Sequence, residues 1–249
     1  MTSRIITSTV SGAYKYRKTL YQRLLYQVIF RNKSIRISCA TLLKINDNNR
    51  DLLIKNKLRP NLFSPIGGAI RYSTSITSFL KEIDFQHDGS HSKVKKDKLK
   101  RDLRGFIPAK NLFKFIDWYS TNKDREENSL HREIREELTE IKLGKLLKFT
   151  KGIEFNFLKE VTETPHSVSG KDFLQFRILR VYEISSDFEE LSVLIDNINN
   201  ENNENLIWVT YDDIHQGRDQ SHNLIGSNSS YLISNKKILK EDIAWTDRN

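Results

Sequence analysis

Four glutamates gather on one side of a short segment, residues 128–141, whose pattern predicts a helix. They are Glu133, Glu136, Glu137 and Glu140. At about 100° per residue they fall within one arc of roughly 100°, beside an apolar arc of the same helix. Like charges three or four residues apart repel one another, so this helix requires a compensating partner. Carboxylate oxygens bind divalent cations, which makes the cluster a candidate metal site; ion pairing with Arg132 and Arg135 on a solvated helix is the alternative.

Hydrophobic and turn patterns predict the elements that position these glutamates. Asn128 or Ser129 supplies a side-chain oxygen to cap the helix. The stretch 58–72 contains two prolines and ends a strand on Gly67-Gly68. The remaining predictions are a strand at 35–46, a turn at 47–49, a returning strand at 51–54, a helix at 110–120, long strands at 146–161 and 171–185, and a strand at 206–214.

The N-terminal region is strongly basic. Residues 1–40 contain 8 of the 41 Lys and Arg residues and no Asp or Glu, so the other 209 residues carry 33 basic and 32 acidic side chains. Such asymmetry is typical of contact with nucleic acid, a phosphorylated ligand or an anionic membrane surface. The alternative is a basic helix that docks on an acidic part of the same fold. The apolar spacing in residues 12–32 predicts this helix. Its core-facing stripe would contain Tyr16, Leu20, Leu24 and Val28.

A second basic segment lies at residues 86–104 and has few large apolar side chains. Seven Lys or Arg residues fall between positions 93 and 104, together with two Asp residues. We expect an exposed loop here. Phosphate binding by this loop is a further interpretation.

The composition excludes several classes of protein. With 249 residues, of which 37% are hydrophobic, the chain is long enough to bury a core. No apolar run reaches the roughly 18 residues that a membrane span needs, and basic residues interrupt any apolar signal segment near the start. The single Cys39 excludes an internal disulfide and a cysteine zinc site. We therefore expect a soluble, cytoplasmic protein.

The segment Arg132–Glu137 resembles the R-E-U-x-E-E core of the Nudix box, in which U is an aliphatic residue. In that family a strand ending in Gly-Gly precedes the glutamate helix, and Gly67-Gly68 supplies one here. Residues 206–214 resemble the family's late strand, with its Trp and the acidic start of a closing helix. These features keep the family's order across roughly residues 35–215.

Departures from the usual box point to one branch of the family. Gly68 and Arg132 are separated by 63 residues, and the glycine expected after the box is absent. These features resemble the SMODS-associated Nudix family, found beside bacterial cGAS/DncV-like nucleotidyltransferases. Further similarities are the long insert, Asp102-Leu103-Arg104 followed by Pro108, the aromatic pair Phe115 and Trp118, and Asp124-Arg125-Glu126 before the box, where Asp124 replaces a Glu.

The resemblance implies an α/β/α sandwich around a mixed β-sheet, with the glutamate helix at the active site. The implied organisation is a basic helical segment at residues 1–34 and a Nudix-like domain at 35–249, with an insert at about 73–125. It also implies a Mg²⁺ or Mn²⁺ cofactor and a substrate in which a nucleoside diphosphate is linked to another moiety.

The resemblance also assigns roles to individual residues. Glu133, Glu136 and Glu137 would bind the metal, and Arg132 would orient Glu133. Gly67 and Gly68 would let the backbone approach the helix and the substrate phosphates, where a Cβ would obstruct. The expected catalytic residues are therefore Arg132, Glu133, Glu136 and Glu137, of which the three glutamates bind the metal. Gly67 and Gly68 are the expected substrate-binding residues.

Other side chains are weaker candidates. Nudix enzymes often take a further acidic ligand or base from outside the helix, for which Glu140, Glu160 and Glu163 are available; each is otherwise a surface charge. Aromatic side chains that stack on a base, or else belong to the core, are Tyr72, Phe113 and Tyr119. His131 follows Leu130 but faces away from the glutamate arc.

Two function classes remain open. The first is a metal-dependent hydrolase of a nucleoside diphosphate derivative or signalling nucleotide. The second is a binding module that senses a nucleotide second messenger, as an effector in anti-phage defence linked to a nucleotidyltransferase. A third hypothesis is a nucleic-acid binder that acts through residues 1–40.

Overall fold

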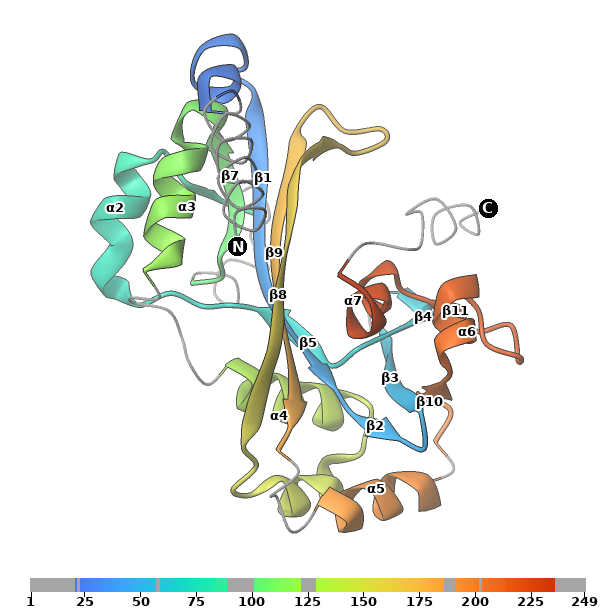
Figure 1. Ribbon diagram of the computed structural model, residues 1–249. Helices are drawn as coiled ribbons and strands as arrows, with labels where there is room; N and C mark the ends of the chain where they lie inside the picture. Colours follow the sequence, from blue (N-terminus) through green and yellow to red (C-terminus); the bar gives the residue numbers. More distant parts are fainter. Residues whose placement is uncertain are drawn as a thin grey trace, which may run out of the picture. The chain divides into compact units, whose positions relative to one another are not determined.

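The computed structural model describes residues 21, 23–56, 59–88, 101–121, 129–185, 191–201 and 203–235 (Figure 1). The chain divides into two compact units. Unit 1 contains residues 1–38, 71–126 and 163–177, and unit 2 contains residues 39–70, 127–162 and 178–249. Three long strands contribute residues to both units: β1 (Ser34–Lys44), β8 (Phe155–Ser167) and β9 (Leu174–Ile184).

Unit 2 contains mixed β-structure. Strand β5 (Gly67–Ala69) pairs antiparallel with β1, which neighbours β9, and β9 neighbours β8. A further sheet has the order β10 (Leu206–Val209), β3 (Arg50–Asn56), β4 (Arg59–Ser64) and β11 (Leu224–Ile225). In this sheet β11 is parallel to β4 and the other neighbours are antiparallel.

The predicted turn at 47–49 is confirmed. Strand β2 (Asn46–Asp47) turns directly into β3 through Asn48 and Asn49, whose φ angles are 49° and 62°. Both angles are positive, and asparagine tolerates this left-handed region better than most residues. The hairpin follows from these two residues.

Helices cover unit 2 on two faces. Alternate residues of a strand point to opposite sides, and Leu43 and Leu52 join one apolar core while Leu42 and Leu53 join another. The first core is covered by α4 (Ser129–Glu140), η4 (Gly144–Thr150) and α5 (Leu191–Asn200), and the second by α6 (Tyr211–Gln216) and α7 (Ser230–Ile233). The predicted α/β/α class is confirmed.

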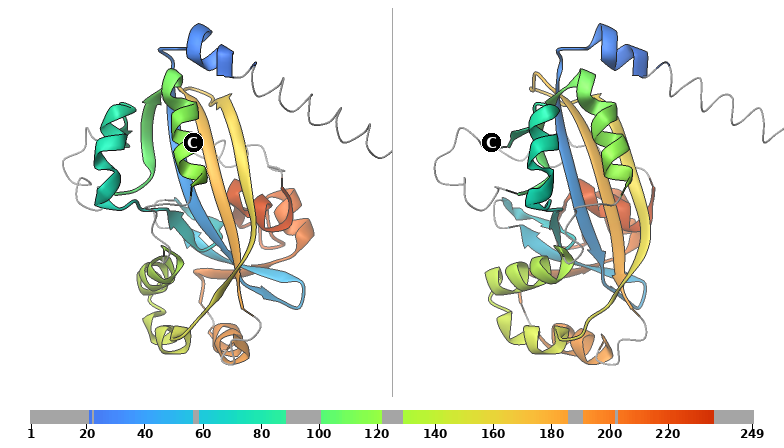
Figure 2. Two further views of the ribbon diagram at one scale, coloured as in Figure 1. Left: turned by 60° about the vertical axis from the view of Figure 1, so that its left-hand side comes forward. Right: turned by 90° about the vertical axis from the view of Figure 1, so that its left-hand side faces the viewer.

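Unit 1 places two helices beside antiparallel strands. Strand β7 (Arg104–Pro108) lies between β6 (Gln86–His87) and residues 34–38 of β1. Figure 2 shows α2 (Thr77–Glu82) and α3 (Leu112–Ser120) next to these strands. They pack through Phe79 and Trp118, whose ring centroids are 5.4 Å apart. Short 3₁₀ turns, η2 (Thr74–Ile76) and η3 (Ala109–Asn111), precede the two helices.

The predicted stripe of the N-terminal helix is wrong where the structure describes it. Leu24 is 55% exposed and Val28 is 66% exposed. The chain widens into a π-helical turn, η1 (Leu25–Ile29), in which Tyr26 is buried instead, against Phe113. Tyr16 and Leu20 lie outside the described residues, as do Asn128, Asp124–Glu126 and the insert residues 89–100.

Two predicted strand boundaries are also wrong. The strand predicted at 146–161 begins only at Phe155, because Leu146 is buried within the 3₁₀ turn η4. The strand predicted at 206–214 ends at Val209, because Thr210 caps α6 through a reciprocal bond with Asp213. The helix at 110–120 is confirmed. None of the helices in the described ranges is long and apolar enough to cross a lipid bilayer.

Candidate functional site

Helix α4 presents its glutamates from the edge of a buried face. Its apolar residues are no more than 4% exposed and pack into the first core of unit 2; they are Leu130, Ile134 and Leu138. Glu133 lies next to this stripe and is itself only 7% exposed. A carboxylate this deeply buried requires a compensating partner. That partner is Arg132 of the same helix, and strand β5 packs against this side of α4.

Strand β5 approaches the helix through its two glycines. A Cβ on Gly68 would overlap the carboxylate of Glu133, and a Cβ on Gly67 would overlap the carbonyl oxygen of Thr41 on β1. The Gly67 amide donates a hydrogen bond to Glu137 Oε2 at 3.3 Å. Only glycine fits at both positions, because a side chain on Gly68 would separate β5 from α4 and one on Gly67 would separate β5 from β1.

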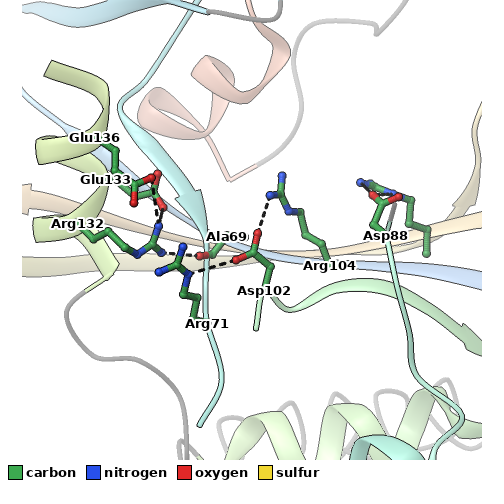
Figure 3. Close-up of polar contacts among 9 residues, drawn as sticks. Ala69, Arg71, Asp88, Asp102, Arg104, Arg132, Glu133 and Glu136 are labelled. Carbon is green, nitrogen blue, oxygen red and sulfur yellow. Dashed lines mark hydrogen bonds and ion pairs between the residues drawn. The ribbon is translucent and has the colours of Figure 1, made fainter. Parts of the chain in front are cut away.

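Arg132 links the same two elements from the other side. Its Nη2 donates to the carbonyl oxygen of Ala69 at 3.2 Å, and its Nη1 donates to Glu133 Oε1 (Figure 3). The same Nη1 lies 3.8 Å from Glu136 Oε2. The guanidinium therefore fixes the position of the Glu133 carboxylate and offsets its charge.

Glu137 remains the least compensated carboxylate. Burial and the neighbouring charge of Glu133 raise its pKa well above the ordinary value, and the charges of Glu140 and Glu136 act in the same direction. The hydrogen bond from Gly67 opposes this shift only in part. A positive charge brought to this helix face would relieve the repulsion.

The structure brings the predicted residues of β5 and α4 together. Glu136 and Glu140 lie on exposed positions of α4, one turn from Glu133 and Glu137 respectively. In the described part of the chain, no group of three or more His, Cys, Asp or Glu side chains is placed to hold a metal ion. The donors nevertheless suit Mg²⁺ or Mn²⁺, because carboxylate oxygens are hard ligands and the Glu137 site disfavours its own negative charge.

Three of the weaker candidates, Glu160, Glu163 and His131, make contacts outside the glutamate cluster. Glu160 is exposed and pairs with Arg180 at 3.8 Å. Glu163 belongs to unit 1, where Arg177 lies 3.3 Å from its carboxylate. His131 is exposed and makes an edge contact with Phe155.

The three aromatic candidates are core residues. Tyr72, Phe113 and Tyr119 are each no more than 9% exposed. The Tyr72 hydroxyl lies 2.9 Å from His87 Nε2, and the Tyr119 ring stacks on Phe115. Their burial favours packing over base stacking.

Sequence reasoning did not anticipate two backbone groups of the site. The Ala69 carbonyl holds Arg132, and the Gly67 amide holds Glu137. Every residue has a main-chain carbonyl, and every residue except proline has a main-chain amide. The residue types of β5 therefore did not indicate which of its main-chain groups would contact α4. The one signal was the paired glycine, which indicated close approach without naming the partner.

Comparison with protein-family models matches residues 34–233 to the SMODS-associated NUDIX domain. The match includes β5, α4 and the residues between them. No curated protein matches the chain.

Proposed function

The chain belongs to the SMODS-associated NUDIX domain family, and we propose that it is a metal-dependent hydrolase of a phosphoanhydride bond. The substrate would be a nucleoside diphosphate derivative or a signalling nucleotide. One observation supports this most: the Gly-Gly strand and the glutamate helix, 63 residues apart in sequence, meet through Gly67 and Glu137 and through Ala69 and Arg132.

The metal would be Mg²⁺ or Mn²⁺, with Glu133, Glu136 and Glu137 as its ligands. Such an ion neutralises pyrophosphate charge and lowers the pKa of water, which makes hydrolysis accessible near neutral pH. The donor chemistry of the helix face fits this ion, because two of its carboxylates already repel each other.

The protein's own groups have separate tasks in this proposal. Arg132 holds Glu133 in one orientation through the Ala69 carbonyl. The Gly67 amide holds Oε2 of Glu137 and so orients this carboxylate on the face that would bind the metal. Exposed Glu136 reaches the solvent side, from which a phosphate would approach.

The biological setting is part of the same proposal. A cytoplasmic effector linked to a cGAS/DncV-like nucleotidyltransferase would act on cyclic oligonucleotides during anti-phage defence. A nucleotidyltransferase gene beside the gene for this chain supports that setting, and its consistent absence from such neighbourhoods contradicts it.

A second candidate is a nucleotide sensor without turnover. It is favoured by the ion pair between Arg132 and Glu133, which already offsets one of the carboxylates that a catalytic metal would use. A sensor would retain ligand affinity when the glutamates lose their charge.

The distinguishing experiment is an assay of a substrate panel with Mg²⁺ or Mn²⁺. The panel contains nucleoside diphosphate derivatives, dinucleoside polyphosphates and cyclic oligonucleotides. We expect Glu137→Gln to lower turnover at least about 10²-fold with little loss of binding, since it removes a group that acts in the transition state. Glu154→Gln, which changes an exposed glutamate of unit 2, is the matched control and should retain full turnover.

The opposite result is equally clear. If the wild-type chain binds one of these nucleotides tightly and cleaves none, while Glu137→Gln binds equally well, the hydrolase proposal fails and the sensor stands.

A further inference from the structure

A second cluster of charged side chains lies in unit 1, around Asp102. This aspartate is only 5% exposed. Arg104 Nη2 donates to its Oδ2 at 2.7 Å, and Arg71 Nε lies 3.5 Å from its Oδ1 (Figure 3). The backbones of Arg71 and Asp102 also form an antiparallel bridge. One buried carboxylate therefore anchors two guanidinium groups.

The ion pairs with Asp102 neutralise only part of the positive charge of Arg71 and Arg104 and use only some of their hydrogen-bond donors. Two guanidinium groups share a single carboxylate, so one charge has no counterpart within this trio. The Arg71 side chain is 24% exposed and the Arg104 side chain 38% exposed, so both can be reached from solvent. Arg71 contacts Asp102 through Nε, so this contact does not occupy its two Nη groups. Arg104 Nε is buried and has no hydrogen-bond partner among the described residues.

A third arginine extends the cluster along the sheet. Strand pairing places Ser38 opposite Arg104 and Arg36 opposite Phe106, so Arg36 and Arg104 are diagonal neighbours on one face. Arg36 donates to Asp88 Oδ2 from Nε at 3.0 Å and from Nη2 at 2.5 Å. This second pair is balanced, and the excess charge therefore stays at Arg71 and Arg104.

We propose that Arg71 and Arg104, positioned by Asp102, form a binding site for the phosphate groups of a nucleotide. Guanidinium groups bind phosphate through two parallel hydrogen bonds, which the two Nη groups of Arg71 can donate, while Arg104 can donate from Nη1. A pyrophosphate carries enough charge to offset the excess of the trio. The site lies in unit 1 and does not depend on hydrolysis at α4.

The test is a calorimetric titration of the full chain with inorganic pyrophosphate, and then with ADP, in EDTA. EDTA removes divalent cations, so the glutamate helix cannot contribute through a metal. We expect Arg71→Gln and Arg104→Gln each to weaken affinity at least about 10-fold, as for the loss of a charge-assisted contact. Tighter binding of ADP than of pyrophosphate would show that the nucleoside also contacts the protein.

Two controls exclude a general loss of charge. Lys114→Gln removes one positive charge from α3, where Lys114 pairs with exposed Glu82 at 3.0 Å, and affinity should change less than about 2-fold. Glu137→Gln should bind pyrophosphate in EDTA like the wild type. That result separates this site from the proposed hydrolase, which can fail while the arginine site stands.

Two further variants test whether Asp102 positions the arginines and whether a loss of affinity comes from misfolding. Asp102→Asn raises the net positive charge, so simple attraction would strengthen pyrophosphate binding, whereas loss of positioning weakens it. Arg104→Lys keeps the charge and the fold but loses the planar fork, and it should bind more weakly with an unchanged melting temperature. Folded Arg71→Gln and Arg104→Lys variants with wild-type affinity, or a wild-type chain that binds no pyrophosphate at millimolar concentration, would overturn the proposal.

Discussion

The electrostatics of this fold are unfavourable at Glu137. It is a carboxylate in a buried setting, four residues from the buried Glu133 on the same helix. Arg132 forms ion pairs with Glu133 and Glu136, whereas Glu137 accepts a hydrogen bond from the neutral amide of Gly67. Residues placed at such a cost in stability are typical of functional sites. The cost itself can be measured.

Stability should fall as pH rises, and the fall should depend on Glu137. Its pKa is raised in the folded chain, so the native state binds the proton more tightly than the unfolded state does. The stabilisation is complete below the ordinary Glu pKa and is lost as pH rises through the higher native value. In EDTA we expect Glu137→Gln to flatten this part of the profile and to melt higher than wild type near neutral pH.

The measurement is the melting temperature of both proteins at several pH values, with EDTA and with millimolar Mn²⁺. Metal that binds only the native state stabilises it by mass action, so Mn²⁺ should raise the wild-type curve most at high pH and the variant curve less. Parallel profiles for the two proteins, unmoved by Mn²⁺, would contradict both the raised pKa and the metal site.

At the scale of elements, the site is a contact between a three-residue strand and a twelve-residue helix. Strand β5 pairs with β1 at Leu42, Thr41 and Ala40, which fixes its register. Helix α4 is fixed by its apolar residues in the first core. Gly68 sets the distance between β5 and α4, because a Cβ there would overlap Glu133, and Gly67 sets the distance between β5 and β1, because a Cβ there would overlap Thr41.

Gly68→Ala should therefore separate the two elements. The new methyl group would overlap the Glu133 carboxylate, and the adjustment should cost about 1–3 kcal/mol of unfolding free energy, as for other overpacked positions. Gly144→Ala is the matched control, since its Cβ would meet only Thr139 Oγ1 at 3.9 Å. Urea unfolding of both variants checks the difference. Equal stabilities would show that β5 does not pack closely on α4.

Local periodicity predicted the elements that bury a regular stripe and failed where a turn interrupts one. Helix α4 was predictable because its apolar residues recur at helical spacing, and β1 because polar and apolar residues alternate from Ser34 to Cys39. Apolar Leu146 suits a strand equally well, but it is buried in a 3₁₀ turn. The glutamates were visible because one helix carries them all. The contacts of Glu137 with Gly67 and of Arg132 with Ala69 were not, because they involve main-chain groups 70 and 63 positions away in the sequence.

For the whole molecule, the described part of the basic N-terminal region favours docking over a free cationic surface. Of its 8 Lys and Arg residues, the structure describes Arg23, Arg31, Lys33 and Arg36. Three of these four pair with aspartates of unit 1: Arg23 with Asp117, Lys33 with Asp172, and Arg36 with Asp88. Charge that is already paired has little left for an external partner. Nucleic-acid contact through residues 1–40 stays a prediction, and it falls on the remaining cations.

Substitution of Lys15, Arg17 and Lys18 by Gln tests that prediction. Each phosphate that a cation neutralises releases counterions, and the logarithm of affinity for single-stranded RNA falls with the logarithm of salt by about 0.7 per contact. If these three residues contact phosphates, the slope of the triple variant should be smaller in magnitude by about two. Arg23→Gln breaks the ion pair with Asp117 and should leave the slope nearly unchanged. Fluorescence anisotropy across a salt series measures both slopes. A wild-type chain that binds no RNA even at low salt would leave the basic region with a purely structural role, because three of its cations already pair with aspartates of unit 1.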